Sequence, residues 1–303
     1  MGLYAYTNAR GEKIMLKIIL LLTTVLLSGC FSWQPDWKLP AVKSPGKDIS
    51  ILSEHARDLF AHADNRQMLL LAMQVQREAI MAEPENKEAL ALLANQNILF
   101  GAAYAKNANE REEAYLEAMQ IAAQALYANP VFRKRVDRGE SLWEAVDTLK
   151  KDDLDAMGFW VTALFYWYKD CQGAIAQALN FRWIGRARQV MERMTQLDPD
   201  WGHGMLHFTW GIYFLAIPEA VGGDRELSAT YFEKAIATGP NWLQHRWGRG
   251  RYYHIKMGNK EECRKDLEWV LAQDISQAGG PYAWRYYIQE DARKILDNLE
   301  NYF

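Results

Sequence analysis

The chain has 303 residues, half of them hydrophobic, which is enough for a large core without a structural metal or disulfides. Its formal net charge of −3 argues against nucleic acid as a partner, because phosphate binding needs a concentrated basic face. Twelve tryptophans and fifteen tyrosines are costly to leave exposed, so we expect many rings to face a cavity, a groove or a partner.

Residues 1–29 have the features of a signal peptide. An apolar run covers residues 16–27, with Lys17 near its start. It has the length of a signal-peptide hydrophobic region and is too short to span a bilayer in the mature protein. Residues 1–14 carry no such run, so we expect them to be an over-extension of the chain, with Met15 as the initiator.

The run ends in Leu27-Ser28-Gly29-Cys30, which resembles the lipobox of bacterial lipoproteins. This predicts lipid attachment to Cys30, and a triacylated residue carries enough chains for stable anchoring. Phe31 follows where an aspartate would signal retention in the inner membrane, so we predict the periplasmic face of the outer membrane. An ordinary signal peptide with an incidental cysteine is the alternative.

Residues 30–48 are predicted to be a lipidated tether, because they contain three prolines and no periodic pattern. An extended chain of this kind spans about 3.1 Å per residue, so it could hold the folded body up to roughly 55 Å from the lipid. Trp33 and Trp37 would then lie at the membrane interface or dock on the body.

Residues 49–303 contain an internal repeat, and we predict that they form one helical domain. Four prolines each follow a helix, and small residues occupy seven of the eight positions five and twelve residues before them. Tetratricopeptide units need small residues there for close helix packing, and the proline stops the helix. The pairs preceding Pro84, Pro130, Pro199 and Pro240 are Ala72 and Ala79, Ala118 and Ala125, Ala187 and Met194, and Ser228 and Ala235.

The fold class that this repeat predicts is all-α, a degenerate tetratricopeptide-like α-solenoid. The prolines are spaced irregularly and more widely than the roughly 34 residues of a standard unit. The long gap contains an aromatic helix at residues 159–168 that is apolar on nearly every face, so it is either a core helix or the wall of an apolar channel. The segment from Pro281 to the C-terminus is predicted to be a capping helix.

No catalytic motif is evident, and we predict a non-enzymatic protein without metal or cofactor. His203 and His207 have the spacing of metal ligands on a helix, but Gly204 occupies the place of the glutamate in zinc proteases and no third ligand is evident. Gly222 and Gly223 lack the strand and the Lys-Ser/Thr of a phosphate loop.

The loop from Pro218 to Asp224 is instead predicted to be structural, with Gly222 and Gly223 in a tight turn and Asp224 as the cap of the next helix. We expect Gly223 to adopt a positive φ. Cys171 and Cys263 could pair in an oxidising periplasm or remain two buried thiols, and the sequence leaves both open.

Most of residues 50–300 resemble the T-component lipoproteins of tripartite ATP-independent periplasmic (TRAP) transporters, and residues 218–236 are the most specific part of the match. The residues that carry the resemblance are Leu197-Asp198-Pro199, Gly204-Met205-Leu206-His207, Gly211, Tyr213, Pro218, Gly222-Gly223-Asp224 and Phe232-Glu233-Lys234-Ala235-Ile236. The resemblance implies a lipid-anchored trimer in which each protomer has a pore and binds the periplasmic substrate-binding protein, to which it passes a small, hydrophobic ligand.

The aromatic residues of the chain supply candidates for the lining of such a channel, since helical repeats form concave surfaces. The candidates are Trp160, Trp167, His207, Trp210, Phe214, Arg246 and Tyr253. The alternative function is an outer-membrane lipoprotein scaffold that uses the same repeats for protein–protein interaction. A closed interior would favour the scaffold, and a continuous apolar tunnel the transport component.

Overall fold

Helices dominate the structure, a computed structural model that describes residues 31–39 and 49–303. Within those ranges, pairing between extended segments is limited to one isolated bridge from Trp242 to Gly279. The predicted signal peptide, Met15 and the lipid site Cys30 lie outside the described residues. No helix of the described part is long and apolar enough to cross a membrane.

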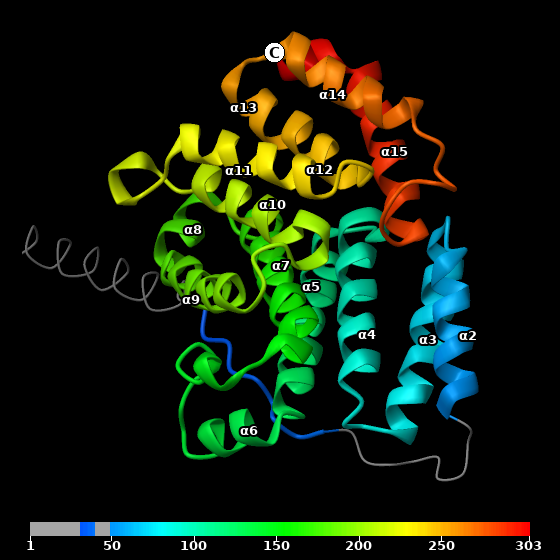
Figure 1. Ribbon diagram of the computed structural model, residues 1–303, viewed down its shortest axis with the longest axis vertical. Helices are drawn as coiled ribbons and strands as arrows, with labels where there is room; N and C mark the ends of the chain where they lie inside the picture. Colours follow the sequence, from blue (N-terminus) through cyan, green and yellow to red (C-terminus); the bar gives the residue numbers. More distant parts are fainter. Residues whose placement is uncertain (1–30, 40–48) are drawn as a thin grey trace, which may run out of the picture.

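The first half consists of antiparallel helix pairs (Figure 1). Asparagine side chains cap the starts of four helices by accepting hydrogen bonds from backbone N–H groups, which fixes where each helix begins. The helices are α2 (Ile49–Ala61), α3 (Arg66–Ala82), α4 (Lys87–Leu99) with the π-helical turn η1 (Phe100–Tyr104), α5 (Ala108–Tyr127) and α6 (Pro130–Val136).

The middle of the chain is organised around α7, which packs along α4, α5 and α9. Buried Asp153 fixes its start, because its carboxylate accepts from Lys87 Nζ at 2.6 Å and from Asn129 Nδ2 at 2.7 Å. The elements are η2 (Val146–Thr148), η3 (Lys151–Asp153), α7 (Leu154–Asp170), α8 (Ala174–Asn180) and α9 (Arg182–Leu197).

The last part contains two further pairs and a final helix. The pairs are α10 (Trp201–Ala216) with α11 (Arg225–Thr238), joined through η4 (Glu219–Val221), and α12 (Leu243–Gly248), η5 (Arg249–His254) and α13 (Ile255–Met257) with α14 (Lys260–Ala272). The chain closes with α15 (Tyr282–Asp297) and η6 (Leu299–Tyr302).

The repeat residues behave as the sequence predicts. All eight positions before the four prolines are buried, and their helices end at Ala82, Tyr127, Leu197 and Thr238. Small side chains at these positions let the backbones of neighbouring helices approach closely. The all-α tetratricopeptide-like fold is therefore confirmed.

The final helix does more than cap the array. In addition to α14, α15 contacts α2 at the other end of the fold, and Trp284 Nε1 donates to Asn95 Oδ1 of α4 at 2.8 Å (Figure 1). Trp284 and Asn95 are both buried. The two ends of the repeat array therefore touch.

Part of the predicted tether packs on the folded body, which corrects one expectation. Residues 31–39 pack along it: the ring of Phe31 lies 4.0 Å from that of Trp167, and Trp37 stacks on Tyr127 at 5.5 Å. Trp33 lies 6.1 Å from Trp160. These rings leave water on docking, so this stretch does not act as a free spacer of tens of ångströms.

Candidate ligand cavity

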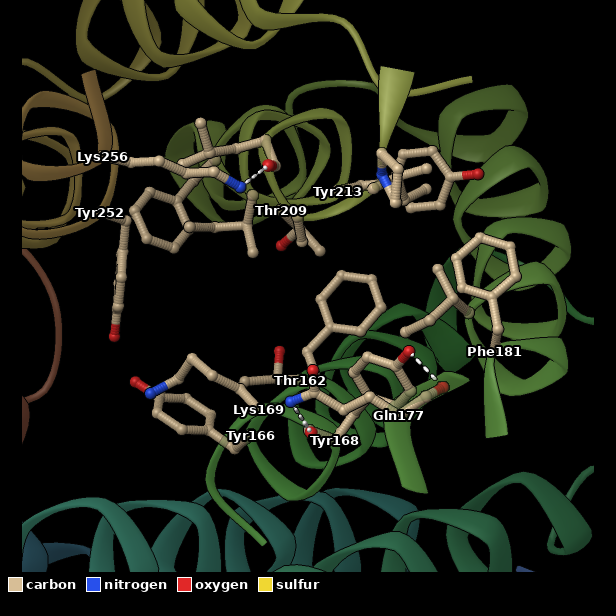
Figure 2. Close-up of a pocket in the computed structure, with 18 of the residues that line it drawn as sticks. Thr162, Tyr166, Tyr168, Lys169, Gln177, Phe181, Thr209, Tyr213, Tyr252 and Lys256 are labelled. Atoms are coloured by element: carbon tan, nitrogen blue, oxygen red, sulfur yellow. Dashed lines mark hydrogen bonds between the residues drawn. The ribbon is translucent and has the colours of Figure 1, made fainter. Parts of the chain in front are cut away.

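A cavity of about 650 Å³ lies between α7, α8, α10 and the helix of η5 and α13 (Figure 2). Its size is within the range of small-molecule sites. The wall is mainly apolar and aromatic. Its residues are Thr162, Phe165, Tyr166, Tyr168, Lys169, Ala174, Gln177, Ala178, Phe181, Ile184, Met205, Phe208, Thr209, Ile212, Tyr213, Leu215, Ala216, Ile217, Pro218, Val221, Gln244, Tyr252 and Lys256.

The helix α7 has two apolar faces with different surroundings. Thr162, Phe165, Tyr166 and Lys169 follow helical spacing and face the cavity. Trp160 and Trp167 share the opposite face, where they are buried and covered by Phe31 and Trp33. The predicted alternatives, core helix and channel wall, therefore both describe α7, but these two tryptophans belong to the core.

The helix α10 is divided in the same way. Met205, Phe208, Thr209 and Ile212 line the cavity. The predicted residues His207, Trp210 and Phe214 lie on another face and gather around Tyr231 of α11, whose ring stacks on that of Phe214 at 5.6 Å. The rings of these three residues hold α10 against α11 and do not reach the cavity.

Arg246 and Tyr253 also lie away from the cavity. Arg246 pairs with the buried carboxylate of Asp266 at 3.2 Å and lies over the ring of Trp269. Tyr253 packs against Phe232 of α11. None of the seven predicted lining residues is in the cavity wall, although each lies on or next to an element that contributes to it.

Most polar groups of the wall are already paired, which leaves its surface apolar. The hydroxyls of Thr162 and Thr209 donate to carbonyls of their own helices, and Tyr168 and Gln177 bond to each other's main chain (Figure 2). Burial raises the pKa of Tyr166 well above its ordinary value, so this phenol stays neutral.

Two lysines provide the only formal charges of the wall. Lys256 Nζ donates to the Leu215 carbonyl at 2.6 Å, and burial followed by the charge of Arg225 lowers its pKa. Lys169 forms an ion pair with Asp170, which is not part of the wall, and lies beside the rings of Tyr166 and Tyr252. The wall contains no aspartate or glutamate, so it is unfavourable to a cationic ligand.

The cavity opens between α8 and the loop after α10. Ala174, Ala178, Pro218 and Val221 belong to its wall and are exposed to solvent. Lys256 and Tyr252 lie at one end of the space, whereas Phe181 and Tyr213 lie at the other (Figure 2). The opening is therefore bordered mainly by small and aliphatic side chains.

The loop that forms part of this rim differs from expectation at one glycine. The positive φ, 102°, belongs to Gly222 and not to Gly223. Gly223 is required for a different reason: a Cβ there would lie 1.9 Å from the Ile217 carbonyl oxygen. Asp224 accepts from Leu227 N–H at 2.9 Å and caps α11.

His203 and His207 were predicted to be one turn apart on a regular helix, but the structure differs. Gly202, His203 and Gly204 all have left-handed backbone angles, so the start of α10 is distorted. His203 stacks on Trp242 and His207 bonds to Asp200 at 2.9 Å. Among the described residues, no group of three or more histidines, cysteines or acids is placed to hold a metal ion.

Cys171 and Cys263 are both free thiols. They belong to different hydrophobic clusters, and burial raises the pKa of Cys171 to about 12 and that of Cys263 to about 11. Of the two alternatives, the structure has unpaired thiols with low reactivity.

The sequence analysis missed Tyr252, Phe208 and Ile212 as lining residues. The available signal was helical spacing: each of α7 and α10 carries two apolar stripes, and nothing in the sequence says which stripe meets a partner helix. Tyr252 lies in the π-helical turn η5, whose extra residue shifts the register of side chains after it.

Comparison with known proteins identifies the family. The family model of the TRAP transporter T-component matches residues 77–303. The chain belongs to the TRAP transporter T-component family. A search of curated proteins finds no match.

A solved structure supports the tetratricopeptide-like fold. A thermophilic tetratricopeptide-repeat protein of Thermus thermophilus is 14% identical, with a TM-score of 0.51 over 82% of this chain and 99% of that one. An assembly chaperone of RpL4 covers 84% of this chain and 98% of its own at 14% identity, but its TM-score of 0.35 is too low for inference. This T-component thus has a tetratricopeptide-like fold and an accessory role in TRAP transport.

Proposed function

We propose that this T-component is a non-catalytic, lipid-anchored periplasmic protein that binds the substrate-binding protein of a TRAP system and passes it a small hydrophobic ligand. The apolar cavity of about 650 Å³ is the observation that carries the proposal. A pocket of this size and wall chemistry suits an uncharged or anionic apolar molecule.

The cavity lies within the residues that match the family, which links it to the transport role. Its wall combines side chains of α7, α8, α10 and η5, all between residues 77 and 303. We propose that the lipid is carried by Cys30, that the anchor is in the periplasmic leaflet of the outer membrane, and that the protein assembles as a trimer. The lipobox and the family resemblance support these points.

A binding titration with the uncharged dye N-phenylnaphthylamine tests the proposal. Ile212→Trp fills the cavity from α10, whereas Gln189→Trp places the same ring on the exposed side of α9 as a control. We expect the first variant to bind the dye about tenfold more weakly or worse and the control to match the unmodified chain. Equal binding by all three would contradict a ligand role for the cavity.

The alternative is a scaffold that uses the repeats only to bind proteins. Both functions predict that Ile212→Trp still binds the substrate-binding protein, and they differ in the dye. A scaffold would bind no dye even as the unmodified chain. A transport component would retain that partner and lose ligand transfer to it. Mixing the anchored chain, dye and purified substrate-binding protein measures both.

A further inference from the structure

The position of Phe31 limits where the predicted lipid can be. Its backbone N–H donates to Asn180 Oδ1 at the end of α8, at 2.7 Å. Its carbonyl accepts from Arg182 at 2.8 Å and from Trp183 Nε1 at 3.2 Å, both at the start of α9. Phe31, the residue that follows the predicted lipid site in the sequence, is therefore fixed at the junction of α8 and α9.

The surface next to this junction is apolar on α8. The helix contains no charged residue, and Ala174, Ile175 and Ala178 are exposed, Ile175 by 78%. The loop across the cavity opening adds Val221, exposed by 57%. Figure 1 shows α8, α9 and the loop before α11 on the same side of the molecule.

The start of α9 adds positive charge to this apolar surface. Arg186 stacks on Trp143 and Trp183 at 3.9 and 4.2 Å, and the exposed Arg182 bonds to the Phe31 carbonyl. Neither guanidinium forms an ion pair with any residue that the structure describes; Glu144, whose charge acts on Arg186, accepts from Ser141.

The acids on this side are already engaged. Glu219 pairs with Arg225 at 3.0 Å, and Asp224 caps α11. An exposed apolar helix followed by arginines without ion-pair partners among the described residues is a composition typical of protein segments that lie in a membrane interface. An anionic headgroup layer would supply ion-pair partners, which neither arginine has among the described residues.

We propose that α8, Arg182, Arg186 and the loop 218–221, together called the bilayer face, rest on an anionic phospholipid bilayer, the one that holds the Cys30 lipid. The proposal depends on the lipid anchor of the proposed function. Because α8 and this loop border the cavity, its opening then faces the bilayer, and an apolar ligand exchanges with the membrane without crossing water.

Backbone amide hydrogen exchange of the complete lipidated protein tests this face. The protein is compared on vesicles that contain phosphatidylglycerol and on vesicles of phosphatidylcholine alone. We expect slower exchange in α8 and the start of α9 on the anionic vesicles, with each arginine contributing about fivefold to the contact equilibrium. Exchange in α14 serves as the internal reference and should be equal on both.

Two variants separate the contributions of charge and apolar surface. Arg182→Gln with Arg186→Gln should abolish the difference between the vesicles, whereas Arg264→Gln with Lys265→Gln, on the surface of α14, should preserve it. Arg186 also packs on two tryptophans, so its replacement could disturb the fold. Ile175→Asp changes an exposed side chain instead, and it should speed exchange in α8 on the anionic vesicles.

The outcomes distinguish the bilayer face from the anchor. A chain that fails to float with either vesicle in high salt would overturn the anchor and, with it, the bilayer face. A chain that floats, but whose α8 exchanges equally fast on both vesicles, would overturn the bilayer face alone. Protection of α8 that survives both the double arginine variant and Ile175→Asp would also overturn it.

Discussion

The seam between α4 and α5 and the space between α7 and α10 are built from different side chains. In the seam, Ala94, Ala118 and Ala122 are completely buried, and the two helices pack along their length. Between α7 and α10, large residues such as Phe165 and Phe208 border the cavity, and the helices meet over a short stretch only. Small residues close a helix seam, whereas rings at the corresponding places hold the helices apart and leave a cavity.

The largest expected effect comes from truncating the two faces of α7. Trp160→Ala removes a completely buried ring from the core and should lower the free energy of unfolding by about 3–5 kcal/mol. Phe165→Ala only enlarges the existing cavity and should cost about 1 kcal/mol or less. Chemical denaturation measures both, and equal losses would show that the two faces are packed alike.

The buried His245 makes the stability of the fold sensitive to acid. His245 Nε2–H donates to the His203 carbonyl at 2.9 Å, and burial lowers its pKa to about 4. In the unfolded chain the pKa is about 6.5, so between these values the unfolded state binds a proton that the folded state does not. The free energy of unfolding should therefore fall by up to about 3 kcal/mol as pH decreases from 6.5 to 4.

The variant His245→Gln checks this dependence, since its amide can donate the same bond and does not titrate. Denaturation at pH 7 and pH 4 should show a smaller acid loss than in the unmodified chain. His55→Gln changes an exposed histidine and serves as the control. An unchanged acid loss in His245→Gln would assign the dependence to other groups.

Substitutions at the cavity rim should lower the stability less than Trp160→Ala does. Their effect should also differ between the two neighbouring glycines Gly222 and Gly223. Gly223→Val places side-chain atoms against the Ile217 carbonyl and should cost about 2–3 kcal/mol. Gly222→Ala meets no neighbouring atom but keeps a positive φ, which costs about 1 kcal/mol. Thermal unfolding of both variants gives the order, and the reverse order would contradict this geometry.

Much of the fold was predictable because the repeat depends on local patterns. Proline stops and small residues such as Ala118 and Ala235 define helix ends and close seams, and they identify the architecture without distant contacts. The return of α15 to α2, through Trp284 and Asn95, was not predictable, because it joins residues that no local pattern connects.

Five of the predicted lining residues lie on α7 and α10, which border the cavity, but on other faces of these helices. Trp160 and Trp210 are larger than Thr162 and Thr209, so a search for prominent aromatics selects the packed stripe over the lining one. The docking of Phe31 was not predicted, and that of Trp33 was one of two open alternatives, because both depend on a tertiary groove to which Trp167 and Trp183 contribute.

The contrast between the apolar cavity at α7 and α10 and the closed α4–α5 seam underlies these predictions. Crystals of the protein held under xenon pressure test it most directly, because xenon enters apolar cavities. We predict anomalous scattering peaks beside Phe165, Phe208 and Ile212, and none between α4 and α5. Density for packed side chains and no xenon between α7 and α10 would contradict the account.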